Sequence, residues 1–239
     1  MVKPWRVIES GRLDVQAVMD KDADLLAALN DASSPILHFY EWDRPCLTFG
    51  YFIDPAHHVK LDQLEKHGLT MGRRPTGGGV IFHLADLAFS VLLPAHHPGF
   101  SMNTLENYAF INLRVARAIA RFSSEMVRPR LFEEGPACLN RKCSPFCMVK
   151  PTQYDLIVEG RKMGGAAQRR TKKGLLHQTS LTLGYPPYEL IKELLHSGED
   201  VIEAMKENTA PLLFSGGNIA LQDVRCRIRK ELIDVFNIA

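Results

Sequence analysis

A run of three glycines, Gly77, Gly78 and Gly79, is the stretch of this sequence best suited to hold a ligand. Glycine has no Cβ and takes positive φ easily, so a ligand can lie against its peptide groups, whose N–H donors can form an anion site. Arg73 and Arg74 stand just before the run. The spacing matches neither the phosphate loop nor Gly-x-Gly-x-x-Gly. A flexible hairpin is the alternative, but the arginines and the apolar residues that follow favour a ligand loop.

A lysine beside a second glycine pair, Lys162, is another candidate for chemistry. It opens an expected strand and is followed by Gly164 and Gly165, so its side chain could reach over bare backbone toward a ligand. Its ammonium group is a compact point charge that suits a carbonyl or phosphate oxygen. Taken alone, the segment would equally describe a surface lysine after a turn.

Three cysteines, Cys138, Cys143 and Cys147, precede this lysine. Their gaps are not Cys-x2-Cys pairs and no second pair follows, so we expect no metal site. Free cysteines are commonly buried and inert. A cysteine near positive charge can instead act as a nucleophile, because the charge favours its thiolate. Cys147 is the candidate for this role, with Lys162 or an arginine as the source of charge.

Composition and length set the broad class of the protein. The 239 residues are 46% hydrophobic and 23% charged, with a formal net charge of +2, as is ordinary for a globular protein. No stretch approaches the roughly 18 apolar residues of a membrane span, and the N-terminus shows no secretory signal. The five cysteines do not suggest a disulfide framework. We therefore expect a cytoplasmic monomer that binds neither nucleic acid nor membrane.

Hydrophobic periodicity predicts the elements that must position these residues. The expected strands are 5–9, 36–42, 46–53, 80–82, 87–93, 154–158, 161–167 and 175–183. The expected helices are 14–29, 57–67, 103–122, 188–196, 200–206 and 218–236, and 123–146 is expected to be mostly loop. In the helix 103–122, Tyr108 belongs to an apolar stripe of the kind that faces a core. Helices and strands mix along the chain, which predicts an α+β fold with a mixed β-sheet flanked by helices. We expect one domain, 1–239, with a helical C-terminal segment from about 187 to 239.

A basic cluster, Arg169, Arg170, Lys172 and Lys173, stands out in a chain of nearly balanced charge. Such a cluster is either a solvated loop or a docking patch for an acidic partner.

The glycine run and its neighbours resemble a signature of the biotin/lipoate protein ligase superfamily. Members that handle lipoyl or octanoyl groups carry an arginine pair, then Ser/Thr-Gly-Gly-Gly, then a short apolar strand that ends in His. The matching positions here are Arg73, Arg74, Thr76, Gly77, Gly78, Gly79 and His83. One departure is Leu84, where many members have Asp.

The stretch around Lys162 resembles a second motif of the same enzymes, Gly-(Arg/Lys)-Lys-(Ile/Val)-(Ser/Ala)-Gly-(Ser/Asn)-Ala. The matching positions are Gly160, Arg161, Lys162, Met163, Gly164, Gly165, Ala166 and Ala167, and Gln168 and His177 continue the likeness. The resemblance runs through most of 30–195 and implies the catalytic-domain fold of this superfamily. It implies that Lys162 is catalytic. It also implies that the acyl or adenylate group is bound by the first motif together with Tyr154, Asp155, Gly164, Gly165, Ala166 and His177.

One branch of the superfamily, the cysteine-dependent octanoyltransferases, shows Cys-x-x-x-Pro-Ser-x-Tyr-Glu. Cys147, Pro151, Thr152, Tyr154 and Asp155 reproduce this spacing with two conservative changes. The resemblance implies that Cys147 takes an octanoyl group from acyl carrier protein and passes it to a lysine of a lipoyl carrier domain. Such domains occur in 2-oxoacid dehydrogenase complexes and in the glycine cleavage H protein. This reaction needs no cofactor.

Two alternatives stay open. A lipoate–protein ligase would activate free lipoate with ATP and Mg²⁺, and would usually carry Asn-Asp where this chain has Tyr154 and Asp155. The glycine run, an arginine and Lys162 would then hold the acyl-adenylate, and Cys147 would be incidental. A non-catalytic homologue that binds only the acyl group or a partner is the second alternative. Leu84 and Gly164, which depart from the motifs, support it.

Overall fold

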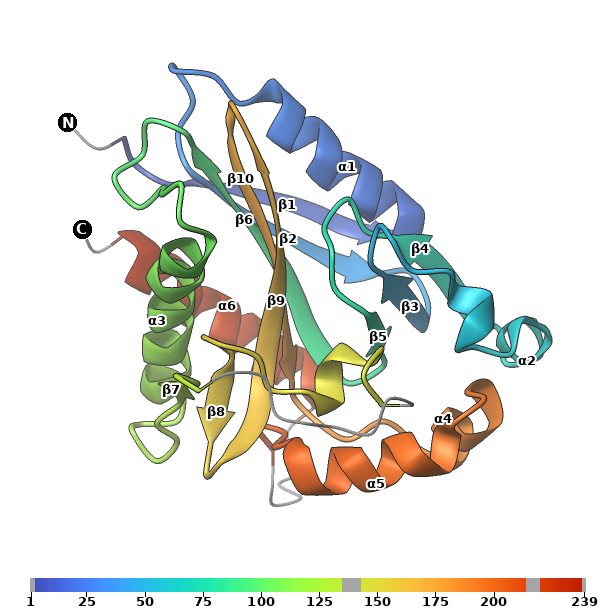
Figure 1. Cartoon of the computed structure of the whole chain (residues 1–239). Coiled ribbons are helices and arrows are strands. Elements are labelled where there is room, and N and C mark those ends of the chain that lie inside the picture. The colour runs from blue at the N-terminus through green and yellow to red at the C-terminus, as the bar shows by residue number, and fades with distance from the viewer. Residues whose placement is uncertain (1–2, 135–142, 214–219, 238–239) are drawn as a thin grey trace.

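The computed structural model describes residues 3–134, 143–213 and 220–237, which form two β-sheets surrounded by helices (Figure 1). The strands are β1 (Arg6–Leu13), β2 (Ile36–Trp42), β3 (Cys46–Phe49), β4 (Thr70–Arg73), β5 (Val80–His83), β6 (Asp86–Pro94), β7 (Arg130–Leu131), β8 (Leu156–Val158), β9 (Arg161–Thr171) and β10 (Gly174–Thr182). The helices are α1 (Val15–Ala28), α2 (Leu61–Lys66), α3 (Thr104–Phe122), α4 (Tyr188–Leu194), α5 (Gly198–Asn208) and α6 (Leu221–Asn237), with short 3-10 turns η1 (Pro55–His57) and η2 (Cys147–Val149). The expected α+β fold is confirmed.

The larger sheet has the strand order β1-β2-β6-β10-β9-β8-β7. It is mixed, because β1 and β2 run parallel while β2, β6, β10, β9, β8 and β7 pair antiparallel with their neighbours. Helices α3 and α6 cover one face and α1 covers the other (Figure 1). Every residue of β6 is therefore buried, as expected for a strand covered on both faces. Strand β9, which carries Lys162, is therefore held in place as an inner strand of this sheet.

The main hydrophobic core lies between the larger sheet and the helix pair α3 and α6. Phe39 and Phe89 from the sheet pack in one cluster with Ile119 of α3 and Ile228 of α6, and all four are at most 1% exposed. Burial of such a side chain stabilises a fold by about 1.5–3 kcal/mol. This core explains why α3 and α6 have a clear apolar stripe in the sequence.

The smaller sheet, in the order β4-β3-β5, carries the glycine run in the connection between β4 and β5. Its core is shared with α4, α5 and η2, so the C-terminal helices pack beside the glycine run. Strand β4 was missed by periodicity because it is short and polar. It pairs with β3, and Gly72 lets α1 approach closely, since a Cβ there would lie 2.8 Å from the Val15 Cγ2 atom.

Most predicted elements are present, but several differ in extent; for example, the strand expected over 154–158 begins only at Leu156 and the strand expected over 161–167 runs on to Thr171. The first strand runs on to Leu13 through a bulge at Gly11, whose φ is +65°. The strand expected over 46–53 ends at Phe49, because Gly50 turns the chain against the glycine run. The helix expected over 57–67 begins only at Leu61, after the turn η1. The stretch 123–146, which was expected to be mostly loop, contains the short strand β7. The turn η2 begins directly after this stretch, at Cys147. Cys138 lies outside the described residues. Among the described helices, none is long and apolar enough to cross a membrane.

Candidate active site

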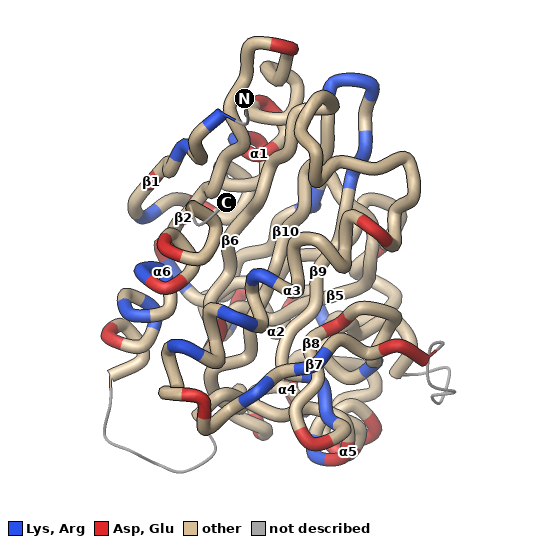
Figure 2. Tube along the Cα trace, turned by 90° about the vertical axis from the view of Figure 1, so that its left-hand side faces the viewer, with Lys and Arg blue, Asp and Glu red and all other residues tan. Residues whose placement is uncertain are grey.

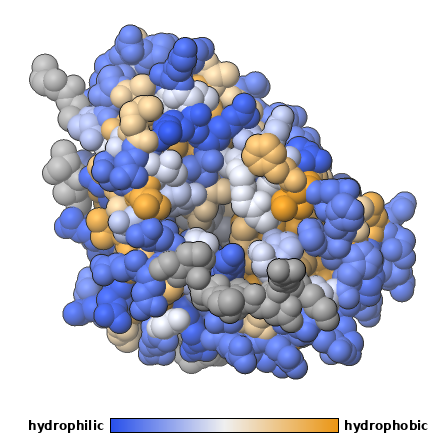
Figure 3. Space-filling model, viewed as in Figure 1, coloured by the Kyte–Doolittle hydropathy of each residue, from blue (hydrophilic) through white to orange (hydrophobic). Residues whose placement is uncertain are grey.

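A cavity of about 530 Å³ lies where the two sheets meet. Its walls come from the glycine run, from η2, from β9 and from Tyr108 of α3. The space-filling view shows a hollow near the middle of this face, with pale and tan residues around it (Figure 3). The volume falls within the about 300–1,000 Å³ of typical small-molecule sites. Among the predicted site residues, those that line it are Gly77, Gly78, Gly79, Cys147, Lys162, Gly164, Gly165 and Ala166.

The glycine run is held from behind by Arg74, which is only 3% exposed. Its guanidinium donates to the carbonyl oxygens of Gly77 and Gly79 at 3.2 and 2.7 Å, and to Thr48 Oγ1 at 2.7 Å. Burial lowers the pKa of Arg74, and negative charge on Cys147 acts in the opposite direction. Arg74 therefore braces the loop from within and places a buried positive charge near the cysteine.

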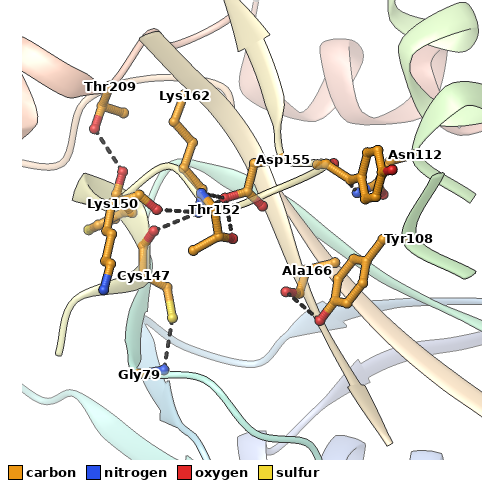
Figure 4. A network of polar contacts seen from close by, with 12 residues as sticks. Gly79, Tyr108, Asn112, Cys147, Lys150, Thr152, Asp155, Lys162, Ala166 and Thr209 are labelled. Atoms are coloured by element: carbon orange, nitrogen blue, oxygen red, sulfur yellow. Dashed lines mark hydrogen bonds and ion pairs between the residues drawn. The ribbon is translucent and has the colours of Figure 1, made fainter. Parts of the chain in front are cut away.

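The sulfur of Cys147 faces the glycine run at the cavity wall (Figure 4). Its Sγ atom accepts a hydrogen bond from the Gly79 N–H at 2.8 Å. A Cβ at Gly78 would lie 3.3 Å from this sulfur, and one at Gly79 would lie 1.8 Å from the Pro145 carbonyl oxygen. The absence of side chains at these two positions is what allows the sulfur to reach the backbone.

Three elements hold the turn η2 that carries Cys147. The Val80 N–H of β5 donates to the Pro145 carbonyl oxygen at 2.8 Å. Lys162 of β9 donates to the Cys147 carbonyl oxygen at 2.8 Å. Thr209, just after α5, donates to the Met148 carbonyl oxygen at 2.9 Å. The cysteine is thus positioned by segments from both sheets and from the C-terminal helices.

The Lys162 ammonium group is fully engaged in the described structure (Figure 4). It pairs with Asp155 Oδ2 at 2.7 Å and donates to the carbonyl oxygens of Cys147 and Lys150 at 2.8 and 3.1 Å. These contacts use all three N–H donors of a lysine. Asp155, 2% exposed, also accepts from the Thr152 N–H and hydroxyl at 2.7 and 2.8 Å. The ion pair is buried, and a buried pair is costly to break.

The second glycine pair makes room for this ion pair. A Cβ at Gly165 would lie 2.7 Å from the Lys162 Nζ atom and 2.9 Å from Asp155 Oδ1. A Cβ at Gly164 would lie 2.6 Å from Leu181 Cδ2, on the neighbouring strand. All three spacings are shorter than van der Waals contact allows. The glycines of β9 therefore serve close packing of the lysine and of the sheet as well as lining the cavity.

Thr76 and His83, two further predicted site residues, act behind the cavity wall. Thr76 donates to Gln178 Oε1 at 2.7 Å, and Gln178 in turn donates to the buried carboxylate of Asp22 at 2.7 Å. His83 Nε2 lies 2.8 Å from Thr48 Oγ1, and its Nδ1 lies 2.7 Å from Asp86 Oδ2. Thr48 Oγ1 also accepts from Arg74 at 2.7 Å, so His83 is linked through Thr48 to the arginine that holds the glycine run. Both residues thus fix the orientation of groups that hold the glycine run.

The remaining predicted site residues lie farther from the cavity wall. Arg73 is exposed and donates to the carbonyl oxygens of Tyr51 and Ile53 at 2.7 and 3.2 Å, so it braces the neighbouring turn. Tyr154 has φ of +68°, and its carbonyl oxygen accepts from Asn112 at 2.8 Å. His177 is fully buried, and this burial lowers its pKa to about 3, so the ring is neutral.

Tyr108 and Gln168 are among the lining residues of the cavity that sequence reasoning did not assign to the site. Tyr108 was placed in the apolar stripe of α3, but its hydroxyl lies 3.4 Å from the Ala166 carbonyl oxygen. Burial, followed by negative charge at Asp155 and Cys147, raises the pKa of Tyr108, so its hydroxyl stays protonated. The only signal in the sequence is that tyrosine is the one polar-tipped residue in an otherwise aliphatic and phenylalanine stripe.

No metal centre is visible in the described part of the chain, where no three His, Cys, Asp or Glu side chains gather as metal ligands. What the site offers is a thiol, a buried ion pair and backbone N–H donors around an apolar cavity. Such a set can perform nucleophilic attack on a carbonyl group and stabilise the oxygen that becomes negative.

Comparison with known proteins finds similarity to enzymes that handle lipoyl and octanoyl groups. The family model of the lipoyl protein ligase A/B catalytic domain matches residues 14–210. The octanoyltransferase LipM of Halalkalibacterium halodurans is 32% identical over 210 residues, which cover 87% of this chain and 76% of that protein. The octanoyltransferase LipM of Bacillus subtilis is 30% identical over 207 residues, which cover 85% and 74%.

Solved structures show the same fold. A bipartite lipoate protein ligase of Thermoplasma acidophilum has a TM-score of 0.74 at 20% identity, covering 97% of this chain and 83% of that chain. A lipoate-protein ligase A bound with ATP has a TM-score of 0.68 at 22% identity, covering 98% and 85%. These likenesses confirm the expected catalytic-domain-like architecture.

Proposed function

Because the chain belongs to the family of lipoyl protein ligase A/B catalytic domains, we propose that it transfers an octanoyl group to a lysine of a lipoyl carrier domain through an acyl-enzyme on Cys147. Membership confirms the resemblance to the biotin/lipoate protein ligase superfamily. The chain is an acyltransferase, because it is similar over most of its length to octanoyltransferases. The observation that carries the cysteine mechanism is the contact between the Cys147 sulfur and the Gly79 N–H at the cavity wall.

The first step of this mechanism is acylation of the cysteine. An octanoyl thioester enters the cavity with its carbonyl carbon at the sulfur and its alkyl chain among the apolar wall residues. The Cys147 thiolate attacks this carbon, the bond to the donor sulfur breaks, and the donor leaves as a thiol after taking up a proton. The Gly79 N–H holds the sulfur at the cavity wall before attack. Backbone N–H groups of the glycine run are suited to the carbonyl oxygen that becomes negative.

The second step is transfer to the acceptor. The neutral amine of the acceptor lysine attacks the acyl-enzyme carbonyl, an amide bond forms, and the bond to Cys147 breaks. The amine loses a proton as the Cys147 thiolate leaves, so that the cysteine is ready for another cycle. The thioester is already activated, so neither step needs a nucleotide or a metal.

Lys162 supports both steps. Its ammonium group holds the backbone of Cys147 and brings positive charge next to the reacting centre. Release of one of its two carbonyl acceptors would free an N–H donor for the negative oxygen. Asp155 holds the lysine in place through its Oδ2 atom, which also accepts from the Thr152 N–H and hydroxyl. The cysteine at the cavity wall and the similarity to octanoyltransferases favour the transferase over the ATP-dependent ligase.

The test is detection of the acyl-enzyme. The protein is incubated without ATP with an octanoyl thioester of acyl carrier protein, and its intact mass is measured. We expect a gain of one octanoyl group in wild type and in Cys226→Ala, a control at an exposed cysteine of α6. We expect no gain in Cys147→Ala. Lipoylation of a lipoyl domain that requires ATP and survives Cys147→Ala would instead establish a ligase.

A further inference from the structure

Exposed apolar side chains occur on two segments that also supply residues to the cavity wall. Phe52 is 89% exposed and precedes Ile53, a wall residue. Met102 is 75% exposed, and Leu105, 39% exposed, lies one helical turn before the wall residue Tyr108. Exposed apolar side chains on either side of a cavity entrance are suited to contact with a partner. The rim is thus suited to a partner whose surface comes close to the cavity.

The tip of the β9–β10 hairpin adds positive charge to the same rim. Gln168 lines the cavity, and Arg169, Arg170, Lys172 and Lys173 follow it, all of them exposed. Figure 2 shows Lys and Arg at this tip. No Asp or Glu occurs anywhere between Glu159 and Glu189.

Hydrogen bonds tie the hairpin tip to the other rim segments. Arg169 donates to the Pro75 carbonyl oxygen at 3.5 Å, next to the glycine run. Arg170 donates to the carbonyl oxygen of Met102 and to Thr104 Oγ1, the latter at 3.4 Å, at the start of α3. The basic tip therefore adjoins the glycine-run side and the α3 side of the entrance, and the exposed apolar residues flank it.

We propose that this docking rim, made of Tyr51, Phe52, Met102, Leu105 and 169–173, binds an acidic acceptor domain that presents its lysine on a protruding turn. The inference rests on the proposed function. A basic hairpin tip, in a segment that contains no Asp or Glu between Glu159 and Glu189, selects an acidic partner. Aromatic residues, Met and Arg are also the residue types enriched in protein interfaces.

The occupant of the docking rim is the acceptor rather than the acyl donor, for a reason of reach. A lysine carries its amine on a stem of only four carbons. For this amine to meet an acyl group on Cys147, the backbone of the acceptor must approach the rim itself. A donor that carries its thioester on a long flexible arm can deliver the acyl group from farther away. Contacts at the rim therefore determine recognition of the acceptor.

The test uses two variants that leave the cavity intact, Phe52→Ala and Lys172→Glu. The matched controls are Met126→Ala, an 84% exposed methionine after α3, and Lys230→Glu on the exposed side of α6. The acceptor is an isolated lipoyl domain of a 2-oxoacid dehydrogenase, and the donor is a small octanoyl thioester of pantetheine. We expect each rim variant to raise KM for the lipoyl domain about five- to tenfold, with acyl-enzyme formation unchanged. Only Lys172→Glu should also weaken the dependence of KM on salt.

Direct binding separates this inference from the chemistry. The affinity of the lipoyl domain is measured by calorimetry with the Cys147→Ala protein, which needs no acyl transfer. Loss of binding in both rim variants, but not in the controls, supports the docking rim even if wild type forms no acyl-enzyme. Unchanged binding and unchanged KM in both rim variants would overturn it. An increase in KM for octanoyl acyl carrier protein, with the lipoyl domain unaffected, would also overturn it, because the rim would then receive the donor.

Discussion

At the scale of single residues, the main feature of the site is that its charges are buried and paired. Lys162 has no free N–H donor, Asp155 accepts from two residues, and Arg74 is bound to the backbone of the glycine run. Such charges are oriented before a substrate arrives, and this preorganisation is what lowers the cost of reaction in enzyme sites. Their arrangement also means that a change at one of them affects both stability and chemistry.

A pair of substitutions separates these two effects at Lys162. Lys162→Met should destabilise the protein by about 3–5 kcal/mol, because it leaves the Asp155 carboxylate buried without its partner. The double variant Lys162→Met/Asp155→Asn removes that charge and should recover most of the stability in urea unfolding. We expect acyl-enzyme formation to remain at least about a hundredfold slow in both variants. If activity returned together with stability, Lys162 would have only a structural role.

At the scale of elements, the site depends on close approach between two loops from different sheets. The glycine run follows β4 of the smaller sheet, and η2 follows a long connection after α3. They touch at Gly79, whose N–H meets the Cys147 sulfur and whose Cα faces the Pro145 carbonyl oxygen. Glycine is required here for space, whereas Gly78 also needs it for its φ of +85°.

Two alanine substitutions within the glycine run should therefore have very different effects. A Cβ at Gly79 would lie 1.8 Å from the Pro145 carbonyl oxygen, while a Cβ at Gly77 meets no atom within 4 Å. Gly79→Ala should displace η2 and slow acyl-enzyme formation by about a hundredfold, whereas Gly77→Ala should stay within about threefold of wild type. Intact-mass time courses measure both rates. Equal loss in the two variants would show that the run is sensitive to any side chain rather than to this contact.

At the scale of the whole molecule, the polar groups of the site are tied to a buried layer that reaches across the larger sheet. Thr76 is linked through Gln178 to Asp22 of α1, and Asp22 contacts His38 Nδ1 at 2.7 Å and accepts from Ser90 at 2.6 Å. Buried networks in which each partner is satisfied make a structure rigid. The position of the glycine run therefore depends on the fold as a whole.

Global stability should fall in mild acid because of buried neutral histidines. Burial lowers the pKa of His177 to about 3, and burial together with Arg114 and His96 lowers the pKa of His97 to about 4. Above pH 6.5 neither histidine affects stability, because the ring is neutral whether folded or unfolded. Below pH 6.5 only the unfolded chain takes up the proton, so each such group costs about 1.4 kcal/mol per pH unit until its folded pKa is reached.

Urea unfolding between pH 7 and pH 4.5 measures this effect. We expect wild type to lose at least about 2–3 kcal/mol over this range through His177 alone. In His177→Gln the decline should be visibly shallower. His57→Gln, at a histidine whose side chain is 77% exposed, should follow the wild-type profile. Parallel profiles for wild type and His177→Gln would contradict the assignment.

The sequence by itself determined the class of fold, most elements and the two glycine-rich stretches. These are local properties: periodicity reports which face of a segment is buried, and glycines report where backbone must be approached closely. The pairing of Lys162 with nearby glycines was visible for the same reason. Strand β4 and the late start of α2 could not be predicted, because short polar segments show no hydrophobic periodicity. Their conformation depends on the segments against which they pack.

Only the tertiary structure decided what each polar side chain contacts. Of two adjacent arginines, Arg74 is buried behind the glycine run while Arg73 faces outward, and nothing in their local sequence separates them. Thr76 meets Gln178 across 102 positions of the chain, through strand pairing that no local pattern encodes. Tyr108 was predicted to face the core, but it lines the cavity because β9 carries small residues opposite it. The local sequence pattern indicates which side chains are buried. The partners of each polar side chain depend on the register and packing of distant segments, and these contacts form the site.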